Sequence, residues 1–168
     1  MGVDEQRVAL YKQAMGNYPT GVTVVTALDE NDEPIGLTVN SFASVSVDPL
    51  LILWSINKQS STHDIFKQTD QFAVNILADS QADVATLFAT PTSNQERFAN
   101  CEWTFSKTKL PLITGSAAVF QCTSFKQIDA GDHTVLIGEV FELAAEQKSP
   151  LLYHGRKMGA LPTSFHEK

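Results

Sequence analysis

Residues 117–146 read AAVFQCTSFKQIDAGDHTVLIGEVFELAAE, and both halves of this stretch are rich in apolar and β-branched residues. The two halves, 117–128 and 133–146, predict a pair of long strands. Between them, Ala130-Gly131-Asp132 supplies the residue types that a tight hairpin turn requires. The stretch therefore predicts a long antiparallel hairpin.

The segments that precede this hairpin predict further short strands. Strands are expected at 21–28, 35–39, 42–47, 50–56 and 71–77, with turns at 29–34 and at Asp48-Pro49. Because regular alternation of strands and helices is missing, the pattern favours an antiparallel β-barrel over a parallel sheet. No repeat or linker is visible, so we expect one domain over residues 1–168.

Three helices are expected at the periphery. Asp4 is expected to cap the first helix, which ends at Gly16-Asn17. The second helix spans 61–67, and Ser80 with Asp83 is expected to cap the start of the third. The apolar positions at helical spacing are Val8, Tyr11 and Met15 in the first helix and Val84, Leu87 and Phe88 in the third. Residues 90–116 are rich in Thr, Ser, Asn and Pro, and they predict a long excursion over the surface.

Composition and charge exclude several classes of function. The 168 residues are 43% hydrophobic and include ten Phe, which is enough for a packed core. The formal net charge of −7 argues against binding to nucleic acid or to an anionic membrane. The sequence contains no secretory signal and no apolar run long enough to span a bilayer, and Cys101 and Cys122 stand far apart. We therefore expect a cytoplasmic protein with reduced cysteines, in which any phosphate-bearing ligand is met by local donors.

Residues 36–42 (GLTVNSF) form a small polar cluster between two predicted strands. Thr38, Asn40 and Ser41 supply hydroxyl and amide groups there. A flavin ring needs donors and acceptors along its pyrimidine edge, and this cluster could provide them. An ordinary turn that uses the same side chains for local backbone hydrogen bonds is the alternative.

Residues 57–64 (NKQSSTHD) form a second candidate segment. Ser60, Ser61 and Thr62 precede a predicted helix, where backbone N–H groups suit a phosphate, and Lys58 adds a local cation. Asp64 stands three residues after Ser61, so a capping box without any ligand is the alternative.

Gly131-Asp132-His133 at the predicted hairpin tip is the third candidate. The turn explains the first two residues but not the histidine, so His133 is either a nicotinamide-positioning group or a solvated side chain. The other histidines are scattered and show no metal-ligand spacing, so we expect no metal site. No nucleophile elbow and no Rossmann fingerprint occur, so any dinucleotide binds in a different mode.

In this order, these segments resemble the flavin reductase-like family. The matching stretches, which together cover about residues 7–160, are 21–26 (GVTVVT), 36–46 (GLTVNSFASVS), Asp48-Pro49-Leu50, Ser60-Ser61-Thr62, 72–77 (FAVNIL), Arg97-Phe98, Pro111-Leu112-Ile113, Gly131-Asp132-His133, Gly138-Glu139-Val140 and Pro150-Leu151-Leu152-Tyr153. One departure is the run Gly155-Arg156-Lys157-Met158-Gly159, which lacks an aromatic residue that many relatives carry there.

The resemblance implies a mainly β fold, an antiparallel Greek-key split β-barrel with a few peripheral helices, and a homodimer with a flavin near the subunit interface. It implies an NAD(P)H:flavin oxidoreductase that uses FMN or FAD with NADH or NADPH and that could supply a monooxygenase partner. A non-catalytic flavin-binding sensor or carrier is the alternative, and an oxidase of the pyridoxamine-phosphate type ranks third.

The resemblance also assigns roles by position. The residues that it places at the isoalloxazine ring are Thr38, Val39, Asn40 and Ser41, with Ser55, Ile56 and Asn57 behind them. It places Lys58, Ser60, Ser61 and Thr62 at the phosphate, Arg97 near the phosphate or ribityl chain, and His133 near the nicotinamide.

Overall fold

The computed structural model describes residues 4–166 as a mainly β molecule with helices at its periphery. The strands are β1 (Thr20–Gly21), β2 (Thr23–Leu28), β3 (Pro34–Val39), β4 (Ala43–Val47), β5 (Leu50–Asn57), β6 (Gln71–Ile76), β7 (Trp103–Phe105), β8 (Pro111–Ile113), β9 (Ala118–Ala130), β10 (His133–Ala145), β11 (Leu151–His154) and β12 (Lys157–Ala160). The helices are α1 (Glu5–Gly16), α2 (His63–Gln68), α3 (Ala82–Ala89) and α4 (Asn94–Ala99), with short 3₁₀ turns η1 (Asp79–Gln81) and η2 (Thr163–Phe165).

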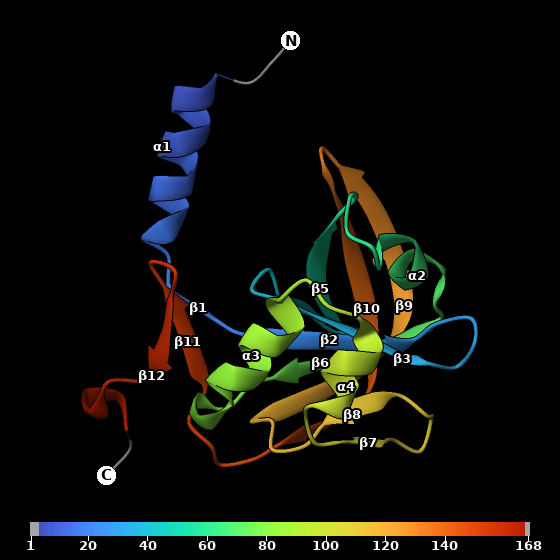
Figure 1. Ribbon diagram of the computed structural model, residues 1–168. Coiled ribbons are helices and arrows are strands. Elements are labelled where there is room, and N and C mark those ends of the chain that lie inside the picture. The colour runs from blue at the N-terminus through green and yellow to red at the C-terminus, as the bar shows by residue number, and fades with distance from the viewer. Residues whose placement is uncertain (1–3, 167–168) are drawn as a thin grey trace.

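Seven strands form one sheet in the order β3-β2-β6-β9-β10-β5-β4, and every neighbouring pair is antiparallel (Figure 1). β3 and β5 stand near opposite ends of this order, yet they contact each other, so the sheet curls into a barrel. The predicted hairpin of β9 and β10 is confirmed, and so is the antiparallel β-barrel. None of the helices between residues 4 and 166 has the length and apolar character needed to cross a bilayer.

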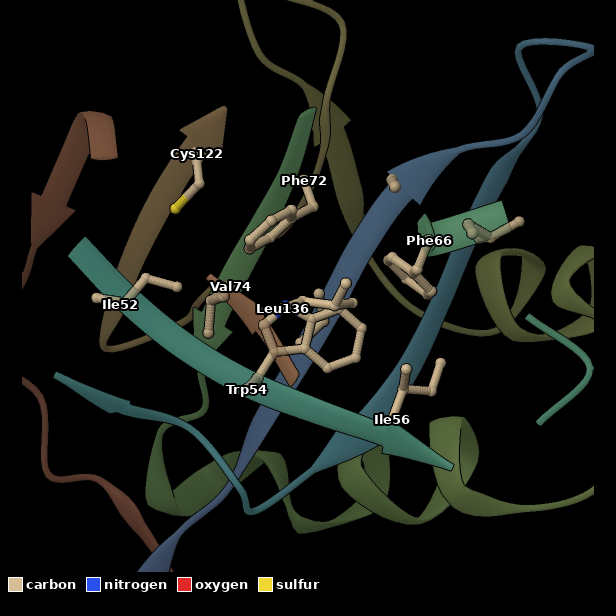
Figure 2. Packing of buried hydrophobic residues seen from close by; sticks show 11 residues of the cluster. Ile52, Trp54, Ile56, Phe66, Phe72, Val74, Cys122 and Leu136 are labelled. Carbon is tan, nitrogen blue, oxygen red and sulfur yellow. The ribbon is translucent and has the colours of Figure 1, made fainter. Parts of the chain in front are cut away.

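The interior of the barrel is packed around Trp54 from the central part of β5. Its ring meets Phe66 of α2 and Phe72 of β6 edge-on, with centroid separations of 4.9 and 5.9 Å. Leu136 and Val74 lie against the same indole, and all five side chains are fully buried (Figure 2). This inner core fixes which face of each strand points inward.

A second core lies outside the barrel, beneath α3 and α4, which cover β2 and β3 (Figure 1). Val24 of β2 points into it, whereas Val25 points into the inner core, so β2 is buried on both faces. Phe88 of α3 and Phe98 of α4 pack edge-to-face with a centroid separation of 5.1 Å. The burial on both faces explains why β2 has apolar side chains on both of its faces instead of alternating apolar and polar residues.

Two expectations for the middle of the chain are wrong. Residues 90–116 are not a surface excursion, because this stretch folds into α4, β7 and β8 and buries Phe98, Leu110 and Ile113. The high content of Thr, Ser, Asn and Pro in this stretch hid these buried side chains.

The expected helix starts also differ. α2 begins at His63, two residues later than expected, and Ser61 and Asp64 form no capping box there. α3 begins after η1, where the Gln81 side chain, rather than Ser80, accepts from the Ala78 N–H at 2.9 Å. The cap of α1 is confirmed, because Asp4 accepts from the Gln6 N–H at 3.0 Å.

Gly138 in β10 is a test of the inner packing. A Cβ at this position would lie 2.5 Å from Phe72 Cζ and 2.8 Å from Cys122 Cβ, both on strands that flank the core. We expect Gly138→Ala to lower the free energy of unfolding by about 1–3 kcal/mol, because the ring and the neighbouring strand have to move. Urea denaturation followed by tryptophan fluorescence measures the change.

The control for this variant is Gly159→Ala in β12, where nothing lies within 4 Å of the added methyl group. It should unfold within about 0.5 kcal/mol of the wild type. If Gly138→Ala matches Gly159→Ala, the close packing described for this part of the core is incorrect.

Candidate functional site

The outer face of the β5–β10 pair brings three of the predicted site residues together. Asn57 is paired with His133 and Ser55 with Val135 across this antiparallel ladder. Directly paired residues point to the same face, and alternate residues point to the opposite one. Ile56 and Thr134 accordingly lie buried inside, whereas Ser55, Asn57 and His133 share the outer face.

Ser41 joins this face through the backbone of Ser55. The Ser41 hydroxyl donates to the Ser55 carbonyl at 3.1 Å and accepts from the Ser55 N–H at 3.0 Å. These two hydrogen bonds to one residue fix the chain after β3 against β5. The Ser41 hydroxyl therefore has a structural role.

The backbone around Ser41 leaves donors available. Within residues 4–166, the N–H groups of Asn40, Ser41 and Phe42 make no hydrogen bond to another protein group. Asn40 is exposed, and the other two residues are half-buried. Three successive free N–H groups beside an ordered strand end can receive the acceptor atoms of a planar ligand.

The turn after β5 is tied to the tip of the β9–β10 hairpin. The Lys58 N–H donates to the Asp132 carbonyl at 2.9 Å, and the Ser60 N–H donates to the Asn57 carbonyl at 3.0 Å. Lys58, the serines and His133 therefore gather at one end of the barrel, as Figure 1 shows for the ends of β5 and β10 near α2.

The three hydroxyls of this turn differ in exposure. Ser61 is exposed and Ser60 is half-buried, but Thr62 is only 3% exposed, and its hydroxyl lies 3.2 Å from that of Ser60. Ser60 and Ser61 can thus reach a ligand from solvent, while Thr62 can act through Ser60.

His133 is held in place by its neighbour. Its Nδ1 lies 2.8 Å from an Asp132 carboxylate oxygen, and 41% of its side chain is exposed. The hydrogen bond and charge of His133, with a smaller contribution from Lys58, lower the pKa of Asp132 below its ordinary value. An ionised Asp132 accepts from Nδ1–H, which leaves the Nε2 edge of the ring free to meet a ligand.

A second carboxylate lies close to the same turn. The hydrogen bond from Thr134 lowers the pKa of Asp129, and the charges of Lys67 and Lys58 lower it further. Lys58 is therefore near two carboxylates, and it supplies the positive charge of the turn in an acidic setting.

Thr38 and Arg97 lie on the other side of β3, under the helices. The Thr38 hydroxyl donates to the Ala85 carbonyl of α3 at 2.7 Å. Arg97 donates to the carbonyls of Gly36 and Thr90 at 2.8 and 2.9 Å, and burial lowers its pKa. The structure does not bring these two side chains together with Asn57, Lys58 and His133.

Two more predicted residues contribute no free side chain. Val39 packs against the inner core and its carbonyl accepts from Thr23, while Ile56 is 1% exposed. Any contact from these residues to a ligand comes from the backbone.

His63 is a residue of this region for which we predicted no role. It is 8% exposed, and its Nε2 lies 2.9 Å from the Thr134 hydroxyl, 71 positions away in the sequence. In the sequence, a single histidine next to Asp64 is typical of a solvated helix residue. Its partner Thr134 is distant in the sequence, so this contact is visible only in the folded structure.

No group of three His, Cys, Asp or Glu side chains in the part of the chain that the structure describes is arranged to hold a metal ion. Burial raises the pKa of the Cys101 thiol to about 11 and that of Cys122 to about 12, so both thiols are poor nucleophiles near neutral pH.

Comparison with known proteins identifies the family of this chain. The family model described as "Flavin reductase like domain" matches residues 15–162. FMN reductase (NADH) SmoA of Agrobacterium fabrum is 43% identical over 149 residues, which are 89% of this chain and 83% of that protein. The reductase component of the flavin-dependent trigonelline monooxygenase of Acinetobacter baylyi is 49% identical over 129 residues, 77% of this chain. The chain spans only 41% of that relative's length.

Among solved structures, the NADH:FAD oxidoreductase SgcE6 of Streptomyces globisporus, in complex with NAD and FAD fragments, superposes with a TM-score of 0.89. It is 30% identical, and the match covers 99% of both chains. The family match spans most of the chain, and the superposition extends over the whole barrel. The chain therefore belongs to the flavin reductase-like family and has its split-barrel fold.

Proposed function

We propose that this protein is an NAD(P)H:flavin oxidoreductase in which hydride passes from a reduced nicotinamide to FMN or FAD. The observation that carries the proposal is the shared outer face of β5 and β10, where Ser55, Asn57 and His133 lie beside the free N–H groups of residues 40–42. Family membership supplies the reaction class. NADH is the nicotinamide that we favour, because the names of SmoA and SgcE6 both include it.

The residues present fit a flavin. The N–H groups of Asn40, Ser41 and Phe42 can donate to the carbonyl and nitrogen acceptors of the pyrimidine edge. Ser55 and Asn57 would lie behind the ring, on the outer face of β5. Ser60, Ser61 and Lys58 suit the phosphate, with Thr62 supporting Ser60. α2 has only six residues, so we assign phosphate recognition to hydroxyls, backbone N–H groups and the lysine rather than to a helix dipole.

For this reaction the protein has to position the flavin and nicotinamide rings and to stabilise the negative charge of the reduced flavin. When bound, flavin and nicotinamide supply the redox chemistry themselves, since hydride passes directly between stacked rings. N–H donors along the pyrimidine edge stabilise the negative charge of reduced flavin. His133, held by Asp132, positions the nicotinamide, and no side chain is required to transfer a proton. For Thr38, Val39, Ile56 and Arg97 we propose an indirect role: these residues hold the backbone of the ring-binding segment in place.

The proposal extends to two partners. The names of relatives include reductase components of flavin-dependent monooxygenases, so we infer that reduced flavin from this protein serves a separate monooxygenase.

The proposed location is the cytoplasm. The acidic chain with its two free cysteines fits this location.

A second copy of the chain is the other partner that we propose. α1 projects away from the barrel and buries none of its residues (Figure 1). Leu10 and Tyr11 of this helix are 64% and 67% exposed, and both line an open hollow with Arg7, Val8 and Ala14. Isolated short helices have marginal stability in water. The apolar side chains along this hollow, which we call the apolar stripe of α1 (Val8, Leu10, Tyr11 and Ala14), are therefore best explained by packing against another subunit.

The reductase activity is tested with the purified protein and its His133→Ala variant. We expect the wild type to oxidise NADH only when FMN or FAD is present. His133→Ala should raise the KM for NADH about tenfold or more while the flavin Kd changes less than about twofold, because only nicotinamide positioning is lost. Flavin fluorescence titration and steady-state kinetics give the two numbers. Equal loss of both affinities contradicts the role of His133, and no NADH oxidation with either flavin contradicts the reductase.

The dimer is tested by sedimentation velocity on Leu10→Glu. A carboxylate placed in the apolar stripe of α1 should weaken self-association about tenfold or more, because the charge would have to be desolvated at the interface. Gln13→Glu on the same helix adds the same charge outside the hollow and should sediment as the wild type does. A monomeric wild type, or equal behaviour of the two variants, contradicts the proposal.

A further inference from the structure

A chain of hydrogen bonds with a buried bond at its centre runs beneath the proposed site. His63 Nε2 lies 2.9 Å from the Thr134 hydroxyl, and this hydroxyl donates to an Asp129 carboxylate oxygen at 2.9 Å. Thr134 is fully buried, and His63 nearly so. On its other side, His63 Nδ1 lies 3.0 Å from a carboxylate oxygen of the exposed Asp64.

The donors and acceptors of this chain follow from its chemistry. A hydroxyl has one hydrogen, and Thr134 gives it to Asp129, whose carboxylate can only accept. Thr134 must then accept from His63, so Nε2 of the His63 ring carries a hydrogen. Nδ1 faces the Asp64 carboxylate and can donate to it only when it carries a hydrogen as well. The ring thus donates from α2 to the buried Thr134 of β10.

The two ends of this bond stand next to the two proposed binding segments. His63 directly follows Ser60-Ser61-Thr62, and its own N–H donates to the Ser60 carbonyl at 3.1 Å. Thr134 directly follows His133 on β10. At the surface, the bond between the Lys58 N–H and the Asp132 carbonyl is a second link between the same two segments.

We propose that His63 is a positioning residue: its bond to Thr134 fixes the phosphate-binding turn against the strand that carries His133. The proposal rests on the proposed function and deepens it. With the surface link alone, the turn could pivot about Lys58, and a flavin phosphate held there would no longer set the ring at the right distance from His133. Two links, one at the surface and one buried, hold both segments in one arrangement.

The test compares FMN with riboflavin, which lacks the phosphate, by fluorescence titration of the intact protein. In the wild type, FMN should bind more tightly than riboflavin. In His63→Asn, whose shorter amide cannot reach Thr134, the FMN Kd should rise about five- to tenfold and the riboflavin Kd less than about twofold. His63→Gln places an N–H close to the position of Nε2 and should restore most of the FMN affinity.

Thr134→Val removes the other end of the bond and should reproduce the effect of His63→Asn. The double variant should be no worse than either single one, because both changes remove the same interaction. His63→Asn, Thr134→Val and the double variant should also raise the KM for NADH in the steady-state assay, because His133 shifts relative to the flavin.

The control for a general loss of stability is Thr26→Val. The Thr26 hydroxyl is equally buried and donates to the Pro111 carbonyl at 2.6 Å, on the far side of β2 from this turn. Thr26→Val should lower the stability of the protein and leave the preference for FMN over riboflavin unchanged.

The outcomes separate the inference from the proposed function. If the wild type binds FMN and riboflavin equally, the phosphate assignment itself is wrong. If the wild type prefers FMN and His63→Asn keeps that preference, the positioning role of His63 is overturned while the proposed function stands. Equal weakening of both flavins in His63→Asn and Thr134→Val, or no rescue by His63→Gln, also overturns it.

Discussion

The antiparallel register of β10 against β5 is the constraint on which the site depends. β10 is hydrogen-bonded to β5 on one side and to β9 on the other, and over His133–Glu139, where the register with β5 is unbroken, its side chains alternate between the two faces. Thr134, Leu136 and Gly138 point inward, and His133 points outward beside Asn57. A slip of one residue would bury His133 and expose Thr134. The inner core prevents it, because Trp54, Phe72 and the missing side chain of Gly138 fit in only one register.

The location of the site follows from which faces the fold covers. α3 and α4 cover the outer face of β2 and β3, where Phe88 and Phe98 complete the second core. Within residues 4–166, no helix covers the outer face of β5 and β10 in this way, although Val135 and Ile137 there are apolar and only half-buried. A planar flavin is a ligand that such a half-apolar face can accept, and the donors of residues 40–42 stand at its border.

The sequence predicted the strands of the seven-stranded sheet well because their signals are local, whereas β7, β8, β11 and β12 were not predicted. Alternating apolar residues and turn-forming residues marked the long hairpin of β9 and β10, and the register then placed His133 beside the turn after β5. The start of α2 was not predictable in the same way. Thr62 and His63 are buried through contacts with Ser60 and Thr134, and the latter lies 71 positions away. Local capping rules do not include such contacts.

Hydroxyl groups show the same limit. Thr38 and Ser41 were chosen as ligand-binding residues because of their chemistry, yet one hydroxyl is bound to Ala85 and the other to Ser55. A sequence pattern states which donors exist but not which of them the fold already uses. The backbone N–H groups beside Ser41 carry no such signal in the sequence, and they became candidates only when the hydrogen bonds of the fold were known.

The central claim is that this protein brings a flavin and a nicotinamide into contact for direct hydride transfer. The most direct measurement mixes the protein and FMN with NADH in the absence of oxygen and follows the visible absorbance of the flavin. The account predicts loss of that absorbance with one flavin reduced for each NADH, and a slower rate when the transferred hydrogen is replaced by deuterium. A flavin that binds but stays oxidised would contradict it.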